Sequence, residues 1–442
     1  MKILICGAGI AGTALTLLLS NLNKDSKHQL KITLLERAPS LRDTGLQVDL
    51  RGPGIQVLRR MGLEEAFQKV AVQEQGLRMV DSNWKSWGYF PANKSGKGLQ
   101  SFTSEFEIMR GDFCRMLYAG CLGGDEVEVR FGVWVTQVKQ RENGDRGVEV
   151  VFSDGKTEEF DLVVGADGLG SRMRRMMMMG YGVDDDVNPG YHSLGAYAAY
   201  GTVAQKMKEG ENYDAVGFMA TRNRGVMVRR HRPDVYQAYV FCRTDAAVEL
   251  NSSSSVRSDS LEEEKRALVQ VFKGTGWNVE RTVQGLVEAD DYYRERIGVI
   301  KLDRWHQGRA VLVGDAAYCP SAMTGMGTTC GIVGAYILAG EIAKHCSGDP
   351  GVVSDEAITA ALQEYEKKLR PFMDQVQKGL TDSDNYMDKF PSSSLGIALV
   401  YYLFWISSLL RLDVLARWVL REDTKGWALP DYPELDRGMA DS

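Results

Sequence analysis

Short apolar runs recur along the chain, and each one ends in a glycine-containing or acidic turn. Residues 3–6 form the first run and lead into Gly7-Ala8-Gly9-Ile10-Ala11-Gly12, after which residues 13–22 have the mostly apolar pattern of a helix. A second run, residues 32–35, ends at Glu36. Continuous apolar runs of this length are typical of strands buried on both faces, as in parallel sheets. Residues 1–40 are therefore predicted to form a strand, a turn, a helix and a second strand.

Two later segments repeat this pattern. Residues 162–164 run directly into Gly165-Ala166-Asp167-Gly168, and residues 310–313 run into Gly314-Asp315-Ala316-Ala317. Both runs are predicted to be buried parallel strands. The polar residues that follow would then face the crevice at the carboxyl edge of the sheet, where open α/β sheets bind ligands.

The middle of the chain follows a different rule, because apolar and polar residues alternate there. Alternation over residues 191–242 predicts an antiparallel sheet, and residues 76–99 alternate as well. At 442 residues the chain exceeds the roughly 250–300 at which a single core stops growing, so two domains are expected. The predicted fold class is α/β: a discontinuous Rossmann-type domain, an inserted, mainly antiparallel β-sheet domain and a C-terminal helical segment. The predicted bounds are 1–75, 100–185 and 295–350 for the first domain, 76–99 and 186–294 for the second, and 351–442 for the C-terminal helices.

Charge and cysteine usage exclude several classes. A net charge of −6 gives no basic field for nucleic acid. The seven cysteines are scattered and the five histidines are isolated, so neither a disulfide framework nor a metal site is predicted. Unpaired cysteines are typical of a reducing compartment, and we expect a cytoplasmic protein. Residues 1–19 could also be a secretory signal peptide, but the glycine pattern needs them as the first strand and helix of the fold.

Gly7, Gly9 and Gly12 stand where a dinucleotide-binding fold needs glycine. Glycine lets backbone amides approach a pyrophosphate at a helix N-terminus, where the helix dipole favours negative charge. Glu36 follows Gly12 by 24 residues, near the roughly 20 expected for a carboxylate that hydrogen-bonds a ribose hydroxyl. The alternative is a glycine-rich turn that holds no ligand.

The three glycine segments, in this order and spacing, resemble the para-hydroxybenzoate hydroxylase class of FAD-dependent aromatic monooxygenases. The resemblance covers about residues 1–380 and is greatest to the branch of the tetracycline-inactivating flavin monooxygenases. Further matching pieces are Glu36-Arg37, residues 43–52, residues 108–112, residues 161–174 and residues 305–327. The resemblance implies noncovalent FAD in the discontinuous Rossmann-type domain.

The resemblance also implies roles for individual residues. Glu36, with Arg37 beside it, would hold the adenosine ribose, and Arg110 the linker region of FAD. Asp315 would accept hydrogen bonds from the ribityl chain. The remaining assignments are Asp49 to FAD, Arg42 to the nicotinamide cofactor, and Asp167 with Gly168 to both the flavin and the nicotinamide pyrophosphate.

Gly325-Met326-Gly327 precedes a predicted helix over residues 332–344. Free amides of Gly325, Gly327 and Thr328, together with the positive end of the helix dipole, would face the pyrimidine edge of the flavin. Such a placement stabilises the negative charge of reduced flavin by about 0.3–2 kcal/mol. The alternative is a plain glycine-rich turn.

The chain departs from the family pattern beside this site. Relatives often carry His after the Gly-Asp-Ala-Ala run, whereas this chain has Tyr318 followed by Cys319. These changes concern the shape of the active site rather than the cofactor. No adjacent base supports Cys319 as a nucleophile or covalent flavin anchor, so a packing thiol is expected.

The implied reaction is reduction of FAD by NADPH or NADH, reaction with O2, and oxygen transfer from a C4a-hydroperoxyflavin. With a single Gly-x-Gly-x-x-Gly, the nicotinamide would bind transiently. The product would be a hydroxylated or epoxidised small molecule that is bulky and partly apolar, aromatic or polyketide-like. Apolar candidates to line its site are Tyr200, Phe218, Met227, Tyr239 and Phe241. No catalytic side chain is assigned. The alternatives are a flavin halogenase or dehydrogenase, or a redox scaffold without oxygen transfer; the sequence lacks the halogenase Trp-x-Trp-x-Ile-Pro run.

Residues 395–410 contain no charged side chain, but they are fewer than the roughly 20 apolar residues of a membrane-spanning helix. By resemblance, this segment is expected to be buried as a helix that bridges the two domains. The alternative is peripheral membrane contact through residues 395–421. The sequence gives no oligomeric state.

Overall fold

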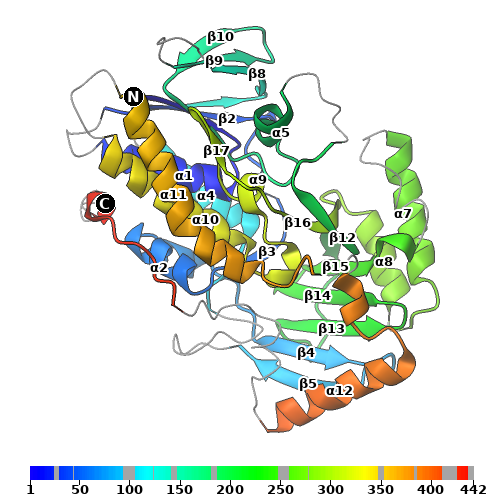
Figure 1. Cartoon of the computed structure of the whole chain (residues 1–442). Coiled ribbons are helices and arrows are strands. Elements are labelled where there is room, and N and C mark those ends of the chain that lie inside the picture. The colour runs from blue at the N-terminus through cyan, green and yellow to red at the C-terminus, as the bar shows by residue number, and fades with distance from the viewer. Residues whose placement is uncertain are drawn as a thin grey trace.

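The computed structural model describes residues 1–23, 29–42, 44–92, 105–122, 124–140, 147–180, 187–246, 258–276, 278–346, 353–382, 386–410 and 426–436. Two large sheets lie side by side in this part of the chain (Figure 1). The first is surrounded by helices, and the second is covered by helices on one face. The predicted α/β class with a second, mainly antiparallel sheet is confirmed.

The first sheet has six strands in the order β17-β18-β11-β1-β2-β7. All are parallel except β17, which pairs antiparallel with β18. Their bounds are β1 Lys2–Cys6, β2 Lys31–Glu36, β7 Val127–Phe131, β11 Leu162–Gly165, β17 His306–Gln307 and β18 Ala310–Leu312. Ile5 stands opposite Val164 on one side and Leu34 on the other, and all three side chains are buried. The four apolar runs at residues 3–6, 32–35, 162–164 and 310–313 thus lie in neighbouring parallel strands, β1, β2, β11 and β18.

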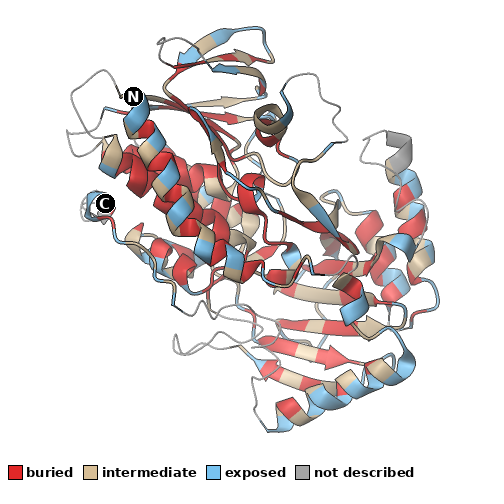
Figure 2. Cartoon of the chain, viewed as in Figure 1, coloured by how far each residue is buried: buried red, intermediate tan, exposed pale blue. Residues whose placement is uncertain are grey.

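Helices cover this sheet. α1 (Ile10–Leu22) packs between α4 (Arg110–Cys121) and α10 (Gly327–His345), and α10 packs in turn against α11 (Asp355–Val376). Shorter elements nearby are α2 Pro53–Arg60, α3 Glu64–Val70, α5 Arg172–Met179 and α14 Pro433–Asp436. A small antiparallel sheet is formed by β8 Val135–Gln140, β9 Val148–Phe152 and β10 Thr157–Phe160. Most of the buried side chains of the fold lie in this layer (Figure 2).

The second sheet has seven strands in the order β16-β12-β15-β14-β13-β4-β5. Their bounds are β4 Gly76–Val80, β5 Ser86–Pro91, β12 Tyr191–Ala204, β13 Asp214–Ala220, β14 Arg224–Arg232, β15 Val235–Arg243 and β16 Tyr293–Ile300. One face packs against α7 (Ser258–Phe272) and α8 (Val279–Val287). The opposite face meets side chains of the first domain, including Leu46 and Met323. Small connecting elements are η1 Thr244–Ala246 and η3 Tyr386–Lys389.

The C-terminal helix does not lie where the sequence predicted it. The main contacts of α12 (Ser394–Leu409) are with β5 and β13 of the second sheet. They are made through Ile397, Tyr401 and Phe404. Its outer face is exposed, with Leu395 82% and Leu409 66% accessible. The expectation of a buried helix bridging both domains is therefore wrong for residues 394–410. The expectation came from the resemblance, whereas in this structure the second sheet covers only one side of this apolar helix.

None of the helices in the described part of the chain is long and apolar enough to cross a membrane. Residues 411–421 of the proposed membrane-contact segment lie outside the described residues.

Candidate functional site

The glycine turn after β1 is shaped by close backbone contacts. Gly7 has φ +114°, and a Cβ at Gly7 would lie 2.5 Å from the carbonyl oxygen of Ala166. A Cβ at Gly12 would lie 1.9 Å from the carbonyl oxygen of Gly7. Gly9, at the start of α1, meets only Arg110 Nη2 at 3.8 Å. The turn therefore packs tightly toward the protein at Gly7 and Gly12 and is open at Gly9, which fits a cradle for a pyrophosphate.

Glu36 is held beside this turn at the end of β2. Its Oε2 accepts a hydrogen bond from the amide of Ala8 at 3.1 Å, and its Oε1 accepts one from Ala38 N at 2.9 Å. Arg37 follows and is exposed. The carboxylate thus lies at the mouth of the glycine turn, where a ribose next to a bound pyrophosphate would lie.

Arg110 connects the glycine turn to residues 42–45. It is the first residue of α4, and its Nη1 donates hydrogen bonds to the carbonyl oxygens of Arg42 at 3.4 Å and Thr44 at 3.3 Å. Its side chain also lies beside Gly45, where a Cβ would come within 3.1 Å of Arg110 Cδ. Arg42 itself is exposed. Arg110 is therefore tied to the backbone of Arg42 and Thr44.

The carboxylate of Asp167 is held by hydrogen bonds to the start of α5. Its Oδ2 accepts hydrogen bonds from the amides of Arg172 at 2.8 Å and Met173 at 3.0 Å, and its Oδ1 accepts one from Ser171 Oγ. The carboxylate therefore caps α5. Gly168 has φ +79° and nothing lies within 4 Å of a Cβ there, so its backbone is the open part of this segment.

Asp315 follows β18 and begins the short helix α9 (Asp315–Tyr318). The side chain is reachable by solvent, yet burial raises its pKa, offset by a hydrogen bond with Cys319 and by the charges of Arg110 and Arg174. The predicted ribityl-binding residue therefore lies within reach of the charges of Arg110 and Arg174.

The segment from η2 (Ala322–Thr324) to α10 also fits the prediction. Gly325 is left-handed, with φ +64°, and α10 begins at Gly327 with no side-chain cap and no acidic residue in its first turn. The first amides of a helix have no partner within it, so those of Gly327 and Thr328 are directed out of the helix end. The amide of Arg51 donates to Thr329 Oγ1 at 2.9 Å, which ties this helix end to the segment after β3 (Gln47–Asp49).

Tyr318 and Cys319, the departures from the family pattern, turn away from the open side. Tyr318 is buried 4.7 Å from Trp305 between ring centroids, and its hydroxyl accepts a hydrogen bond from Tyr365 at 3.1 Å. Cys319 is buried, and desolvation, with the nearby Asp315 charge, raises its thiol pKa well above the usual range. The expectation of a packing thiol agrees with this environment, because a neutral thiol is a poor nucleophile.

The face of the second sheet toward this site is mostly apolar and aromatic. Tyr200, Tyr239, Phe241 and Met227 belong to one cluster with Leu46 and Met323. Phe218, the fifth predicted substrate-lining residue, is on the other face, among the side chains under α7 and α8. Alternate residues of a strand point to opposite faces, and the sequence alone does not say which face meets the first domain.

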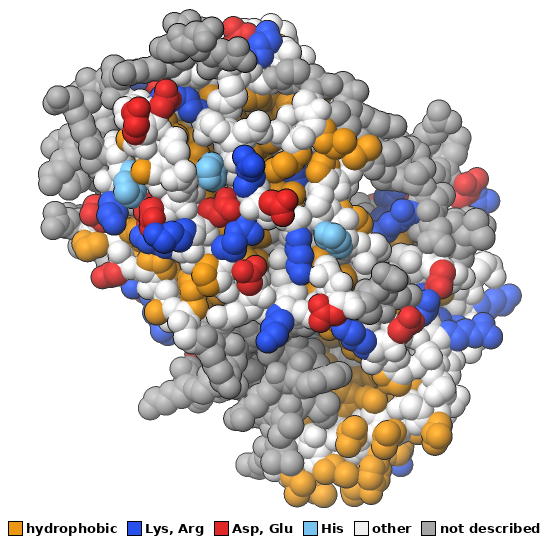
Figure 3. Space-filling model, in the orientation of Figure 1, with side chains coloured by type: hydrophobic (Ala, Val, Ile, Leu, Met, Phe, Trp, Pro, Cys, Tyr) orange, Lys and Arg blue, Asp and Glu red, His pale blue; other side chains and the backbone are white. Residues whose placement is uncertain are grey.

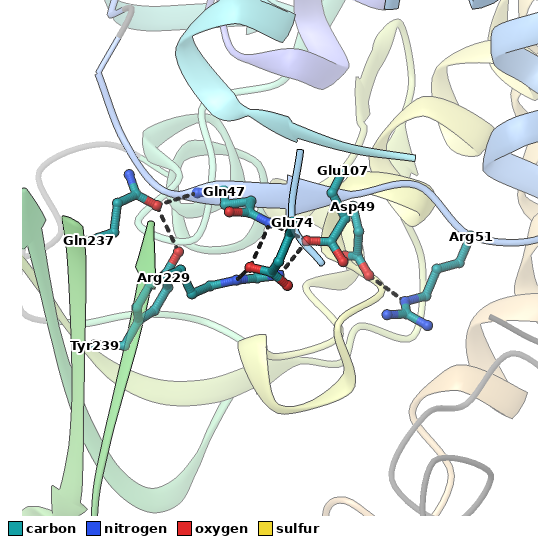
Figure 4. Close-up of polar contacts among 8 residues, drawn as sticks. All are labelled: Gln47, Asp49, Arg51, Glu74, Glu107, Arg229, Gln237 and Tyr239. Carbon is teal, nitrogen blue, oxygen red and sulfur yellow. Dashed lines mark hydrogen bonds and ion pairs between the residues drawn. The ribbon is translucent and has the colours of Figure 1, made fainter. Parts of the chain in front are cut away.

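A buried ionic network joins the second sheet to β3 and β6 (Glu107–Met109). Figure 4 shows Arg229 reaching toward Glu74, with the Asp49–Arg51 pair at the other end of the group. Arg229 donates through Nε and Nη2 to the two Glu74 carboxylate oxygens at 2.7 Å each, and it also contacts Glu107. Burial lowers the pKa of Arg229, but Glu107 and Glu74 more than offset this and raise it.

Gln47 extends the network to the second sheet through its backbone and side chain. Its Nε2 donates to Glu107 and, at 3.4 Å, to Glu74. Its amide N donates to Gln237 Oε1 at 3.0 Å, and Tyr239 OH donates to the same oxygen at 2.9 Å. The strand that carries Asp49 is thus fixed to β14 and β15. Sequence reasoning missed this network, because single charged residues on predicted strands are normally read as solvent-facing.

Among the described residues, no three His, Cys, Asp or Glu side chains gather as metal ligands. The candidate site thus combines the glycine turn, the Glu36 carboxylate beside it, the Asp315 carboxylate and a helix N-terminus without a side-chain cap.

Comparison with known proteins agrees with this geometry. A model of the FAD binding domain matches residues 1–379. The FAD-dependent monooxygenase asL4 of Sarocladium schorii is 43% identical, over 98% of this chain and 99% of the relative. The flavin-dependent monooxygenase eupH of a Phoma species is 37% identical over 90% of each chain. Among solved structures, tetracycline destructase Tet(51) matches with a TM-score of 0.69 and 28% identity, over 98% of each chain.

Proposed function

The chain is an FAD-dependent monooxygenase of the FAD binding domain family, and from that premise we propose that it uses NAD(P)H and O2 to hydroxylate or epoxidise a bulky, partly apolar molecule. Contact between three distant segments carries the proposal: the glycine turn with Glu36, the Asp315 segment, and the first turns of α10. A Cβ at Gly314 would lie 2.9 Å, and one at Gly331 would lie 3.6 Å, from Ala11 Cβ at the start of α1. When bound, the flavin passes electrons from NAD(P)H to O2 and delivers one oxygen atom to the substrate.

We assign the flavin contacts to residues whose environment fits the group. The open backbone at Gly9 and the amides of Gly327 and Thr328 suit anionic parts of the cofactor. Glu36 and Asp315 are acceptors for ribose and ribityl hydroxyls, and Arg110 is a donor between them. Asp49 and Arg37 complete the proposed set for FAD, with Gly7 and Gly12 shaping the turn. Gly325, with φ +64°, shapes the turn before the N-terminus of α10.

The transient nicotinamide cofactor is proposed to use the exposed Arg42 and the open backbone at Gly168. Asp167 contributes by holding that segment, since its carboxylate caps α5. We keep NADPH and NADH as alternatives, because no side chain of the described site distinguishes a 2′-phosphate.

The substrate is proposed to lie against the aromatic face of the second sheet, beside Tyr239, Phe241 and Met227. These side chains exclude water from the reaction and orient an apolar ring system, which is the protein's share of flavin chemistry. The similarity to a tetracycline destructase supports a polycyclic, polyketide-like substrate. We propose a role in secondary metabolism on the same ground. The proposed domain division keeps the substrate sheet, 76–99 and 186–294, apart from the flavin-binding parts of the chain.

A substrate panel tests this function. Purified protein with bound FAD is mixed with polycyclic phenols and polyketides, and NAD(P)H use, O2 use and product mass are measured. We expect at least one compound to stimulate NAD(P)H oxidation and to gain the mass of one oxygen atom. Oxidation without any oxygenated product would instead support the second candidate, a flavin oxidoreductase that does not transfer oxygen.

We also propose that the outer face of α12 contacts a lipid surface from the cytoplasmic side. Leu395, Leu399, Leu409 and Trp405 are exposed on a helix without charged residues, and Figure 3 shows the hydrophobic side chains together at that end of the molecule. Such a helix suits the membrane interface, where Trp is favoured. Cosedimentation with anionic vesicles should fall for the double variant L399E/L409E, whereas V70E, on the exposed end of α3, should bind as before. Equal sedimentation of the two variants would contradict the contact, and a change of mass in solution would indicate pairing of two copies through this face.

A further inference from the structure

Glu295 is an acidic residue on the strand of the second sheet that lies against the proposed flavin segment. β16 packs on α9 and η2, and Ile300 N donates to the carbonyl oxygen of Cys319 at 3.1 Å. On the sheet, Glu295 is opposite Ala198 and Tyr293 is opposite Tyr200. These register positions place Glu295 on the face that meets Leu46 and Met323, not under α7 and α8.

An aromatic group encloses this carboxyl. Tyr200 OH donates to Glu295 Oε1 at 2.9 Å. The Tyr200 ring is stacked on Tyr293 at 6.1 Å and meets Tyr239 and Phe241 edge-on at 5.7 and 6.1 Å. Among the described residues Tyr200 supplies the hydrogen bond to this carboxyl, and no cation is paired with it.

The charges that face the pair come from several elements. The groups are Tyr200 of β12, Tyr293 of β16, Asp315 and the adjoining Cys319 of the α9 segment, and Arg42 and Arg110 across from Tyr293. Burial raises the pKa of Glu295 to about 7, the hydrogen bond from Tyr200 lowers it, and the charge of Asp315 raises it. At neutral pH this carboxyl is therefore divided between its two protonation states, and a nearby change of charge shifts it toward one of them.

We propose that Glu295 takes up one proton from water when the bound flavin is reduced. The inference rests on the proposed function, in which NAD(P)H gives up a hydride, becomes NAD(P)⁺ and leaves the flavin with one added negative charge. Asp315 is already one carboxylate whose charge acts on Glu295, and a second ionised carboxylate beside an anionic flavin is unfavourable in a partly desolvated site. Coupling is reciprocal, so a neutral Glu295 also makes the flavin easier to reduce.

This coupling is measured without catalytic turnover. The midpoint potential of the flavin is determined as a function of pH in the FAD-loaded protein. For a two-electron couple, each additional proton taken up on reduction makes the slope of midpoint potential against pH steeper by about 30 mV per pH unit. Wild-type protein should show this extra slope from about pH 7 upward, where oxidised protein has lost the Glu295 proton and reduced protein has regained it. Glu295→Gln should lack the extra slope. Tyr200→Phe should move its onset to higher pH, because it removes a hydrogen bond that favours the ionised carboxyl.

Glu288→Gln is the matched control, since Glu288 is exposed at the end of α8 on the far face of the sheet. It should keep the wild-type profile. The same extra slope in Glu295→Gln would overturn the proposal and place the proton on another group, including the flavin itself. A wild-type profile without the extra slope would overturn it equally. Protein that takes up no FAD would instead contradict the proposed function, so the two failures are distinguishable.

Discussion

Replacing Arg229 with Met should destabilise the protein strongly, because it removes the cation that pairs with two buried carboxylates. Glu74 and Glu107 have side chains 0% and 1% exposed, and Arg229 is 13% exposed. Removing one partner of a buried ion pair costs about 3–5 kcal/mol, most of it the cost of the unpaired charge. Unfolding entropy of about 2.1 cal/mol/K per residue gives roughly 0.9 kcal/mol/K for 442 residues. The expected fall in melting temperature is therefore about 3–5 °C.

Differential scanning calorimetry measures the thermal stability. Flavin fluorescence recorded during the same heating measures the release of the cofactor. Because Gln47 and Asp49 are fixed through this network, FAD should also be released at a lower temperature. The neutral triple variant R229M/E74Q/E107Q should recover much of the loss, because it leaves no unpaired charge.

Arg232→Met is the matched control on the same strand. Arg232 pairs with Asp234 at the surface, where both side chains are more than half exposed, and such pairs contribute at most about 1 kcal/mol. If R229M melted like R232M, or if the triple variant were as unstable as R229M, the buried-charge explanation would be refuted.

Two further changes test the cofactor site. Asp315→Ala should weaken FAD binding by about 1.5–3 kcal/mol, roughly 10- to 150-fold, while Asp303→Ala, at an exposed position, should bind FAD normally. Flavin titration by fluorescence measures both affinities, and equal affinities would exclude Asp315 as a ligand. Glu295→Gln should leave thermal stability unchanged near pH 4 and increase it at pH 8 by up to about 3 kcal/mol, from a pKa raised from 4.5 to about 7. The sign follows because a raised carboxyl pKa makes ionisation costly, so wild-type stability declines as pH rises through that window; a variant no more stable at pH 8 would show that Glu295 is not desolvated.

Features with a local cause were predictable from the sequence. The buried strands were visible as continuous apolar runs, and Gly7, Gly12 and Gly325 stand where backbone contacts or a left-handed φ require glycine. The carboxylate of Glu36 follows its strand at the spacing of a dinucleotide fold. These features depend on residues that are close together in the chain, so they can be predicted from a single sequence.

Features that depend on pairing across the fold were not predictable. The register of β12 with β16 places Glu295 next to Tyr200. Because this register is not evident from the sequence, the aromatic surroundings of the Glu295 carboxyl could not be predicted. Asp167 follows its strand as expected, but its carboxylate is taken up by the cap of α5. The position of the C-terminal helix was predicted wrongly. An apolar sequence indicates that the helix packs against another surface, but it does not indicate which surface. The assigned roles of the site residues remain predictions.

Labelled dioxygen is the most direct test of oxygen transfer. Protein loaded with FAD is supplied with NAD(P)H, heavy-isotope O2 and a substrate that stimulates NAD(P)H oxidation, and the product is analysed by mass spectrometry. We predict one labelled oxygen atom in the product, and no label when the isotope is supplied in water. A product without label from O2, or consumption of NAD(P)H that yields only hydrogen peroxide with every stimulating compound, would contradict it.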